Sequence, residues 1–311
     1  MSTPRAASPQ LGAVSVATVV EGAPGLTSVP FGSNSVQHGT AVFEGIRSHA
    51  GPGGPLLFRL DDHIDRLLAS AAALGIEHPY GKDELRRMIV GATAATGLAD
   101  TYVRPVLYTP EARLGVDLAR FAFRFGAETW AAPGTGTPAG PGIRLTVSPW
   151  ARPSPRTFPT GVKATGNYAV SALAKTRAAE AGYDDAVQLD PHTGRVAEAT
   201  IANVFAVRSG RLVTPWTRES LLPGITRDTV LRLAEDLGVD TGEEPLTVDD
   251  LAGADELFLT GTALGLVPVA HFENRELPPE RPVFDRLDRA YRDCVGGRVP
   301  ARPGWLTPVV R

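Results

Sequence analysis

The sequence predicts a mixed α+β protein of two domains, and three observations support this. The chain has 311 residues, 43% of them hydrophobic, which is long for a single core. Short β-type runs alternate with helical patterns throughout. A segment of Gly, Pro, Thr and Ala, AAPGTGTPAGPG, occupies residues 131–142 and is typical of a linker. We therefore expect a small N-terminal α/β domain over 1–130, the interdomain linker 131–142, and a larger C-terminal domain over 143–311.

The N-terminal half contains one clearly amphipathic helix. In LDDHIDRLLASAAALG (60–75) the apolar residues recur at helical spacing. Asp61 is a candidate N-cap, and Gly75 ends the pattern. A second helix is expected near residues 82–96. The strand-like runs YVRPVLY (102–108) and RFAFRFG (120–126) follow it.

The C-terminal half carries a second mixture of elements. Two helices are expected over 168–181 and 226–237, and the glycines after them, Gly182 and Gly238, end them. Five short runs are typical of strands. These runs are IRLTV (143–147), DDAVQLD (184–190), NVFAV (203–207), RLVTP (211–215) and ELFLT (256–260).

Charge and cysteine content narrow the functional classes. The net charge of -3 and pI near 6.1 leave no basic footprint, so neither nucleic acid nor a membrane is an expected partner. Small molecules are the expected partners. The single cysteine, Cys294, cannot form an internal disulfide, and the N-terminus lacks an apolar signal core, so we expect a cytoplasmic protein. No metal is expected, because the histidines lack zinc-ligand spacing.

Lysine is scarce, and one lysine differs from the others. The chain has only Lys82, Lys163 and Lys175. The first opens a polar helix and the third lies within a helix, so both are expected to be solvated. Lys163 lies in GVKATGNYAV, where small residues precede a helix and allow the amine to be desolvated and nucleophilic. Taken alone, the segment also fits an ordinary surface lysine.

Several further segments carry a resemblance to a known family. EATIANVF (198–205), LVT (212–214) and LPGITR (222–227) are similar to the spacing signature of the class IV (fold type IV) aminotransferases, which use pyridoxal 5'-phosphate (PLP). Other segments resemble the branched-chain amino-acid aminotransferase branch, in the order that branch shows, over roughly residues 30–270. They are GTAVFEGIRS (39–48), FRLDDHIDRL (58–67), YVRPVLY (102–108), KATGNY (163–168) and TGTALGLVPV (260–269).

The resemblance implies a fold, an activity and an assembly. The fold is the two-domain type IV fold, similar to D-amino-acid aminotransferase, with a mixed, barrel-like core in the C-terminal domain. The activity is transfer of the amino group of an L-amino acid, branched-chain or related, to a 2-oxo acid such as 2-oxoglutarate. The assembly is a homodimer, in which residues near position 38 and the loop 104–116 reach into the partner's pocket.

The resemblance also assigns three residues to the cofactor ring. Lys163 matches the lysine that forms the Schiff base and then shuttles a proton as acid and base. Glu198 matches the carboxylate that pairs with the pyridine nitrogen, which keeps the ring electron-withdrawing. Tyr168 matches the tyrosine that binds the phenolic oxygen. In isolation, the last two also fit a strand-edge glutamate and a core tyrosine.

The cofactor phosphate is assigned to an arginine and to the start of a helix. Arginine can bind phosphate through two nitrogens, and the free amides of a helix N-terminus favour an anion. Arg66 could instead pair with Asp62 on its own helix. The residues implied are Arg66, Leu222, Gly224, Ile225, Thr226 and Thr262.

The substrate residues follow from the same resemblance. Thr262, Ala263 and Leu264 match the segment that binds the substrate carboxylate, although a plain Gly-Thr turn also fits. Phe43 and Trp150 fit an apolar wall. Arg104 fits the group that receives the second carboxylate of glutamate. Phe43 also fits a core position, and Arg104 a charge on the surface of a strand.

Three positions depart from the usual pattern of this branch. His38 stands where a tyrosine is common, Thr165 replaces a glycine, and Leu264 replaces a smaller or polar residue. Histidine makes a pocket wall more polar and sensitive to pH. The sequence thus favours the hypothesis that the amino donor is an unusual amino acid, which efficient use of leucine, isoleucine and valine would contradict.

Other functions share parts of this pattern. A D-amino-acid aminotransferase, an (R)-amine transaminase and a 4-amino-4-deoxychorismate lyase have the same fold and lysine, whereas FEGIR favours the branched-chain branch. A non-catalytic PLP-binding protein is the alternative from another class. It would need only the phosphate site, so the presence of Lys163, Glu198 and Tyr168 together weighs against it.

Overall fold

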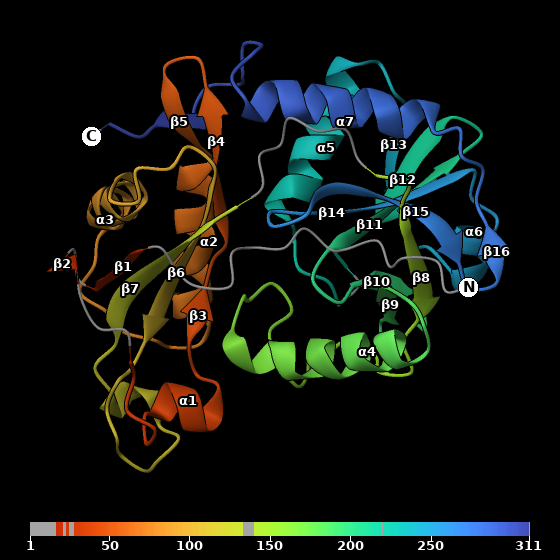
Figure 1. Ribbon diagram of the computed structural model, residues 1–311. Helices are drawn as coiled ribbons and strands as arrows, with labels where there is room; N and C mark the ends of the chain where they lie inside the picture. Colours follow the sequence, from red (N-terminus) through yellow and green to blue (C-terminus); the bar gives the residue numbers. More distant parts are fainter. Residues whose placement is uncertain (1–16, 21–22, 25–27, 133–139, 219, 311) are drawn as a thin grey trace. The chain divides into compact units, whose positions relative to one another are not determined.

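The computed structural model describes residues 17–20, 23–24, 28–132, 140–218 and 220–310 (Figure 1). The chain divides into two compact units, each considered separately below. The N-terminal unit comprises the described residues up to 132 together with 162–166 and 293–310. The C-terminal unit comprises 140–161 and 167–292. Most of the expected linker, 133–139, lies outside the described residues.

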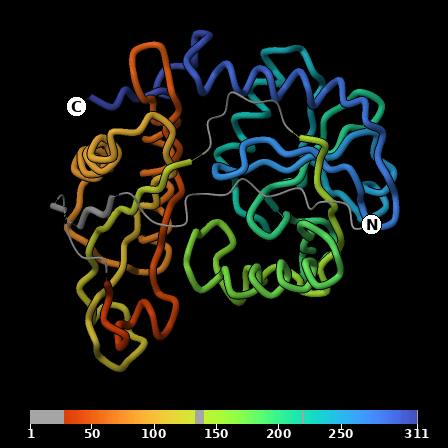
Figure 2. Tube along the Cα trace, in the orientation of Figure 1, coloured from red at the N-terminus to blue at the C-terminus, as the bar shows by residue number. Residues whose placement is uncertain are grey.

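The N-terminal unit is built on an antiparallel sheet of eight strands in the order β17-β5-β4-β6-β7-β1-β2, with β3 paired to β6. The last strand of the chain, β17, thus pairs with the early hairpin strand β5. Figure 2 shows the chain end returning beside this hairpin. The strands are β1 (Ala17–Val20), β2 (Ala23–Pro24), β3 (Val42–Phe43), β4 (Ile46–Gly51), β5 (Gly54–Phe58), β6 (Thr101–Tyr108), β7 (Arg124–Ala131) and β17 (Leu306–Pro308).

Three α-helices and a short 3-10 helix accompany this sheet. The long helices pack on each other, and the second of them also packs against β6 and β7. The first long helix buries Ile64, Leu67 and Ala71 completely, as its periodicity predicts, whereas Leu68 is partly buried. The helices are α1 (Asn34–His38), α2 (Leu60–Ala73), α3 (Lys82–Ala94) and η1 (Leu118–Arg120).

The predicted N-cap of α2 is wrong, whereas its end agrees with the prediction. The helix begins at Leu60, and Arg59 stands at the cap position, where its side chain makes no capping hydrogen bond. Asp61 lies inside the first turn because both of its carboxylate oxygens accept hydrogen bonds from Arg86 on α3, at 2.5 and 2.6 Å. Gly75 follows the helix with φ +67°, a conformation that favours glycine.

The C-terminal unit is built on a mixed sheet of nine strands in the order β10-β9-β8-β15-β14-β11-β12-β13, with β16 paired to β15. The pairs β8–β9, β8–β15 and β12–β13 are parallel, and the others are antiparallel. The strands are β8 (Ile143–Val147), β9 (Asp185–Leu189), β10 (Val196–Ala199), β11 (Asn203–Arg208), β12 (Arg211–Pro215), β13 (Thr241–Glu244), β14 (Glu256–Gly261), β15 (Gly265–Phe272) and β16 (Arg275–Glu276).

This sheet curls, because its edge strand β10 also lies against β11 and β12. Its interior is an apolar core that includes Leu145, Val204 and Phe272. Helix α4 packs on β9, and α5 packs on β13 and β14. The mixed, barrel-like fold class is therefore confirmed. The helices are η2 (Thr165–Asn167), α4 (Tyr168–Glu180), α5 (Ile225–Asp236), α6 (Val248–Ala252) and α7 (Pro282–Val295).

The expected elements mostly coincide with those of the structure. All five strands predicted in the C-terminal half are present. The run RFAFRFG is only partly a strand: β7 starts at Arg124 because η1, capped by the side chain of Asp117, occupies 118–120. In the described part of the chain, the helices are too short or too polar to cross a membrane.

Candidate active site

Lys163 lies on a short segment that joins the sheet of the N-terminal unit. Residues 163–166 run antiparallel to 39–43 through three backbone hydrogen bonds, and Val42 and Ala164 form a β-bridge. The bond from Phe43 N to Lys163 O measures 3.0 Å. Lys163 N also donates to Ser70 Oγ on α2, at 3.1 Å. The backbone of the predicted catalytic lysine is thus fixed from both sides.

Thr165, which departs from the family pattern, strengthens this attachment. Its Oγ1 donates to Ala41 O and accepts from Ala41 N, both at 3.2 Å. One residue later, the backbone approaches Gly39 so closely that a Cβ on Gly39 would lie 3.0 Å from Gly166 Cα. The hydroxyl of Thr165 therefore adds hydrogen bonds that a glycine could not make.

Three of the predicted residues meet around one aromatic ring. The Nζ atom of Lys163 lies 4.9 Å from the ring centroid of Phe43, and the guanidinium carbon of Arg104 lies 4.8 Å from the same centroid. Arg104 also donates to the hydroxyl of Tyr102, at 2.8 Å. Phe43 is 6% exposed, so these cation–π contacts are shielded from water.

Arg66 is engaged by a carboxylate that was not predicted as its partner. Its Nε and Nη2 atoms donate to the two oxygens of Glu44, at 2.6 and 2.8 Å. His63 Nδ1 donates to Oε2 of the same carboxylate, at 2.7 Å. Asp62, the alternative partner considered for Arg66, instead accepts from Arg59 at 2.7 Å.

Burial and charge act in opposite directions on this cluster. Glu44 is fully buried, and burial alone would raise the pKa of its carboxyl group. The charge of Arg66 and the hydrogen bonds from Arg66 and His63 outweigh burial and hold this pKa well below its usual range. Burial lowers the pKa of His63, despite the opposing effect of Glu44. The cluster thus presents an anion, a cation and a neutral imidazole at neutral pH.

Glu198 lies in the C-terminal unit, on β10, with its side chain 8% exposed. Its Oε1 lies 3.0 Å from Nε of Arg152 and accepts from Leu222 N at 3.2 Å. Its Oε2 accepts from Asn203 Nδ2, also at 3.2 Å. The carboxylate is therefore held by a cation and two neutral donors.

The segment before α5 packs closely against the side chain of Asn203. A Cβ at Gly224 would lie 2.0 Å from Asn203 Oδ1, so any side chain at this position would force Asn203 or the start of α5 to move. Asn203 Nδ2 also donates to Leu222 O, at 3.0 Å. Gly224 is the residue before the first turn of the 12-residue helix α5, and Ile225 and Thr226 open this turn. The amides of that turn point out of the helix start, where an anion is stabilised.

The remaining predicted residues of the C-terminal unit lie at turns and ends of elements. Thr262, Ala263 and Leu264 form the turn between β14 and β15, where Leu264 N donates to Gly261 O at 3.2 Å. Tyr168 is the first residue of α4 and is half-buried. The side chain of Trp150 is exposed, with a relative exposure of 49%.

His38 is exposed at the end of α1 and belongs to a polar network. Its Nδ1 lies 3.2 Å from Nδ2 of the fully buried Asn34. Asn34 Nδ2 also donates to Gly115 O at 2.5 Å, and Thr40 donates to its Oδ1 at 2.7 Å. The two regions expected to reach a partner, residue 38 and the loop 104–116, are thus joined within one protomer.

The structure therefore groups the predicted residues in two sets. Lys163, Phe43, Arg104 and Arg66 belong to the N-terminal unit, whereas the cofactor residues from Tyr168 to Thr262 belong to the C-terminal unit. Sequence reasoning missed Glu44, His63, Arg152 and Asn203, although all but Arg152 stand within the quoted motifs. Within the described residues, no group of three or more His, Cys, Asp or Glu side chains could hold a metal ion.

Comparison with known proteins places this geometry in a family. The family model "Amino-transferase class IV" matches residues 41–272. A branched-chain-amino-acid aminotransferase of Salmonella typhimurium is 34% identical over 287 residues, which cover 89% of this chain and 91% of that protein. This chain therefore belongs to the class IV aminotransferases, and the predicted family is confirmed.

Solved structures agree with this assignment. The branched-chain aminotransferase of Thermoproteus uzoniensis, determined with norvaline, is 34% identical, with a TM-score of 0.90 over 96% of this chain and 100% of that one. The branched-chain amino acid aminotransferase of Thermobaculum terrenum, determined in its PLP form, is 30% identical, with a TM-score of 0.87 over 98% of this chain and 99% of that one. Both are aminotransferases, in agreement with the predicted transamination.

Proposed function

We propose that this protein is a PLP-dependent aminotransferase that transfers the amino group of a branched-chain L-amino acid to a 2-oxo acid such as 2-oxoglutarate. The observation that carries the proposal is the placement of Lys163, whose backbone is fixed by the 39–43 segment and whose Nζ lies over Phe43. A fixed backbone holds the amine in one place, which favours repeated reaction at one carbon, and the ring of Phe43 places apolar surface beside the amine. The relatives named above are branched-chain aminotransferases.

The side chains present fit PLP. The cofactor has an aldehyde, a phenolic oxygen, a pyridine nitrogen and a phosphate, and this chain supplies a lysine, a tyrosine, a carboxylate and amide donors. Gly224 lies close to Asn203 and places no side chain in front of the first turn of α5, which leaves room for an anion at the helix start. When bound, PLP supplies an electron sink for the negative charge that develops at the substrate Cα.

Each residue then has a defined task. With PLP bound, Lys163 would hold the cofactor through its aldehyde group and would move the proton at the substrate Cα. Glu198 holds a proton at the pyridine nitrogen, and the hydroxyl of Tyr168 donates to the phenolic oxygen. By resemblance to the family, the residues that would bind the phosphate are Leu222, Gly224, Ile225, Thr226, Arg66 and Thr262.

The substrate tasks follow the same arrangement. Thr262 and the amides of Ala263 and Leu264 bind the carboxylate on Cα. Phe43 and Trp150 line the side chain, and Arg104 receives the second carboxylate of glutamate. The stacking of Arg104 on Phe43 and its bond to Tyr102 orient this cation. His38 adds a polar group that distinguishes this pocket from a purely apolar one.

Assembly and location complete the proposal. We assign the protein to the cytoplasm as a homodimer with no membrane partner. Large exposed apolar side chains support a partner surface on the N-terminal unit: Phe31 and Leu114 are 86% and 91% exposed. Such residues are costly to leave in water and are typical of protein interfaces.

The decisive experiment measures which donors the purified protein uses. The protein, with PLP and 2-oxoglutarate, is supplied separately with L-leucine, L-isoleucine, L-valine and D-alanine, and the 2-oxo acids and glutamate formed are quantified; L-glutamate is supplied with 4-methyl-2-oxopentanoate as the acceptor. Formation of 4-methyl-2-oxopentanoate from L-leucine with equimolar glutamate is expected. Turnover of D-alanine alone would replace the proposal by a D-specific enzyme, and slow use of all three branched-chain donors would favour an unusual donor.

A further inference from the structure

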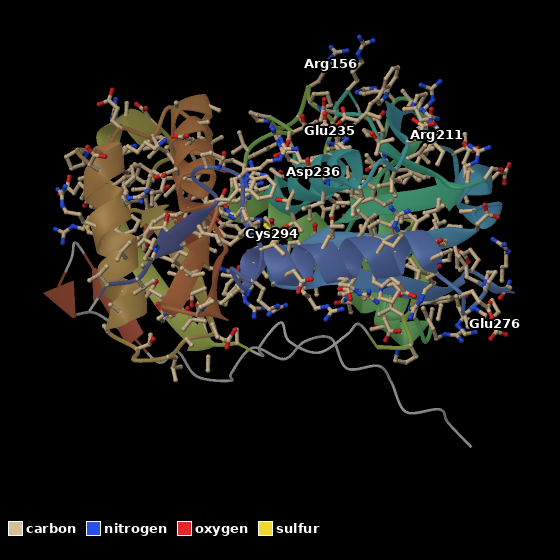
Figure 3. The ribbon with its side chains drawn as sticks, turned by 90° about the horizontal axis from the view of Figure 1, so that it is seen from above. Arg156, Arg211, Glu235, Asp236, Glu276 and Cys294 are labelled. Carbon is tan, nitrogen blue, oxygen red and sulfur yellow. The ribbon has the colours of Figure 1, made fainter. Side chains whose placement is uncertain are left out.

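Arg152 is buried beside the carboxylate that we assign to the cofactor ring. Only 8% of its side chain is exposed, and its Nε lies 3.0 Å from Glu198 Oε1. The same nitrogen lies 3.1 Å from Ser220 O, to which it donates. Arg156, four residues later, points outward from the unit (Figure 3). Because arginine stays protonated at every relevant pH, Glu198 has a permanent positive charge at contact distance.

A second carboxylate fixes the position of Arg152. Asp190 Oδ2 accepts from Ser220 N and Oγ, at 3.1 and 2.5 Å. Its Oδ1 accepts from His192 N and Thr193 N, both at 2.9 Å. Burial would raise the pKa of Asp190, but the bonds from Ser220 and from the 192–193 turn lower it overall. Asp190 thus holds Ser220, whose carbonyl in turn holds the guanidinium.

The backbone of Arg152 is anchored at the same turn. Its N donates to Leu189 O, at 2.9 Å, at the end of β9. Both the main chain and the side chain of Arg152 are therefore tied to the β9–β10 region that carries Glu198. A guanidinium held at two points keeps its distance to the carboxylate, whereas an exposed surface pair would lose much of its interaction to solvent.

Without Arg152, the surroundings of Glu198 would favour the neutral acid. Leu222 N and Asn203 Nδ2, which donate to the same carboxylate, are uncharged, and burial disfavours an anion that lacks a charged partner. A neutral carboxylic acid would donate its own proton to a pyridine nitrogen, which leaves the ring uncharged. A carboxylate anion instead accepts a hydrogen bond from a pyridine nitrogen that carries the proton. The ring is then positively charged and withdraws electrons more strongly.

We propose that Arg152 is a positioning residue that keeps Glu198 ionised, and that Asp190, through Ser220, keeps Arg152 in place. The inference rests on the proposed function for its catalytic meaning. The ionisation state of the Glu198 carboxyl, however, can be measured in the protein without cofactor.

The test is the titration of Glu198 in the full-length protein without PLP. Infrared difference spectra against Glu198→Gln isolate the carbonyl stretch of the protonated carboxyl, which is followed with pH. In Arg152→Met, the midpoint of this titration is expected to rise by about 1–3 pH units, the usual effect of losing an opposite charge at this distance. Arg152→Lys should return most of the shift, and Asp190→Asn should raise the midpoint by less.

A matched control separates this effect from the general loss of a buried arginine. Arg292 pairs with Asp288 at 3.0 Å on α7, which carries no proposed site residue, so Arg292→Met should leave the Glu198 titration unchanged. If Arg152→Met does not fold, Arg152→Gln removes the charge while it retains a polar side chain. An unchanged midpoint in the folded neutral variant would overturn the inference.

A second readout connects the ionisation state to the cofactor. PLP and an analogue with carbon in place of the pyridine nitrogen are bound to each variant, and their dissociation constants are compared. In the wild type, the preference for PLP over the analogue should be large, and in Arg152→Met it should fall by about tenfold or more, which matches the lower end of the expected titration shift. If PLP does not bind to the wild type, the proposed function fails, whereas the cofactor-free titration still decides the role of Arg152.

Discussion

At the scale of single residues, the chemistry depends on which side chains are charged and which are kept neutral. Burial does not act alone: Glu44 is fully buried and yet ionised, because Arg66 and His63 contact its oxygens. Glu198 is similarly buried and has Arg152 as its partner. Each unit therefore contains a buried carboxylate paired with an arginine. The two pairs differ in that Glu44 has a histidine as an additional donor, whereas Glu198 has an asparagine.

Removing the amine of Lys163 should abolish turnover and leave the fold intact. Lys163→Ala is expected to lower kcat by at least about 10²–10⁴-fold, since both the covalent attachment and the proton transfer are lost. Lys175→Ala is the matched control, because that lysine lies on α4 and pairs with Asp185. Turnover rates and melting temperatures of both variants are measured. A Lys163→Ala protein with rates near wild type would contradict the assignment.

His49 should make the protein less stable as the pH falls. Burial, followed by the charge of Arg47, lowers the pKa of His49 to about 3. Unfolded histidine titrates near ~6.5, so between that pH and about 3 the unfolded state binds more protons. The stability that depends on neutral His49 is therefore complete above pH ~6.5 and is lost progressively as the pH falls towards 3.

Urea unfolding at a series of pH values measures this effect. His49→Phe retains an aromatic ring next to Phe58, which His49 contacts edge-on at 6.4 Å between centroids, and removes the titration. The free energy of unfolding of this variant should decline less between about pH 6.5 and 4 than that of the wild type. His192→Ala, on the exposed surface, should retain the wild-type slope. Parallel curves for wild type and His49→Phe would rule out the role of His49.

At the scale of elements, motif segments could be predicted, whereas the contacts between them could not. The C-terminal strands such as β8 and β12 are apolar runs bounded by turn residues and were predicted within a residue or two. β10 was missed because VAEA is short and has no apolar alternation. β17 was missed because it has three residues and ends in a proline.

The same limit applies to the site. Lys163, Glu198 and Gly224 stand in motifs, so they could be predicted as site residues from their neighbours in sequence. The pair Arg66–Glu44 joins positions 22 residues apart, and Arg152 reaches Glu198 from a different loop altogether. Such pairs depend on register and chain path, which no local pattern encodes. A buried arginine two residues after Trp150 had no signal of its own in the sequence.

The approach of Gly224 to Asn203 predicts a strong effect of a single methyl group. Gly224→Ala would place a Cβ 2.0 Å from Asn203 Oδ1, so either the start of α5 or Asn203 must move. We expect a loss of about 1–3 kcal/mol in the free energy of unfolding, together with weaker PLP binding, because Asn203 also holds Glu198. Chemical denaturation and equilibrium PLP titration measure the two effects.

A glycine with free space around it supplies the control. Gly91 lies within α3, and a Cβ there would meet nothing within 4 Å. Gly91→Ala should therefore stabilise the protein by about 0.5–1 kcal/mol, since alanine favours helix more than glycine does. Equal effects of the two substitutions would show that the contact with Asn203 is unimportant.

At the scale of the whole molecule, the exposed apolar residues of the N-terminal unit predict self-association. Leu114, 91% exposed, and Val116, 73% exposed, flank Gly115, whose carbonyl is bound to Asn34 of α1. This loop is therefore held in place while its apolar side chains face outward. Burial of such side chains against a second copy contributes about 25 cal/mol per Å².

Leu114→Glu should shift the protein from dimer towards monomer. Sedimentation equilibrium over a range of concentrations should show a dissociation constant raised by about tenfold or more, because a charge would be placed where an apolar side chain is buried. Leu173→Glu on α4, where the leucine is 53% exposed, changes charge equally at a position outside the proposed interface and should leave the dimer intact. A wild-type protein that is monomeric at micromolar concentration would disprove the homodimer.

The pairing of β17 with β5 has a consequence for biosynthesis. The hairpin of β4 and β5 leaves the ribosome early, but the strand β17 that pairs with β5 consists of residues 306–308. The segment that carries Lys163 also joins this sheet from a later part of the sequence than β3, to which it is bridged. The N-terminal unit therefore cannot complete its sheet until residues 306–308 have been translated. A chain that ends prematurely would lack this edge strand and expose β5 to non-native pairing. Residues 306–308 must therefore be synthesised before the sheet that holds the Lys163 segment is complete.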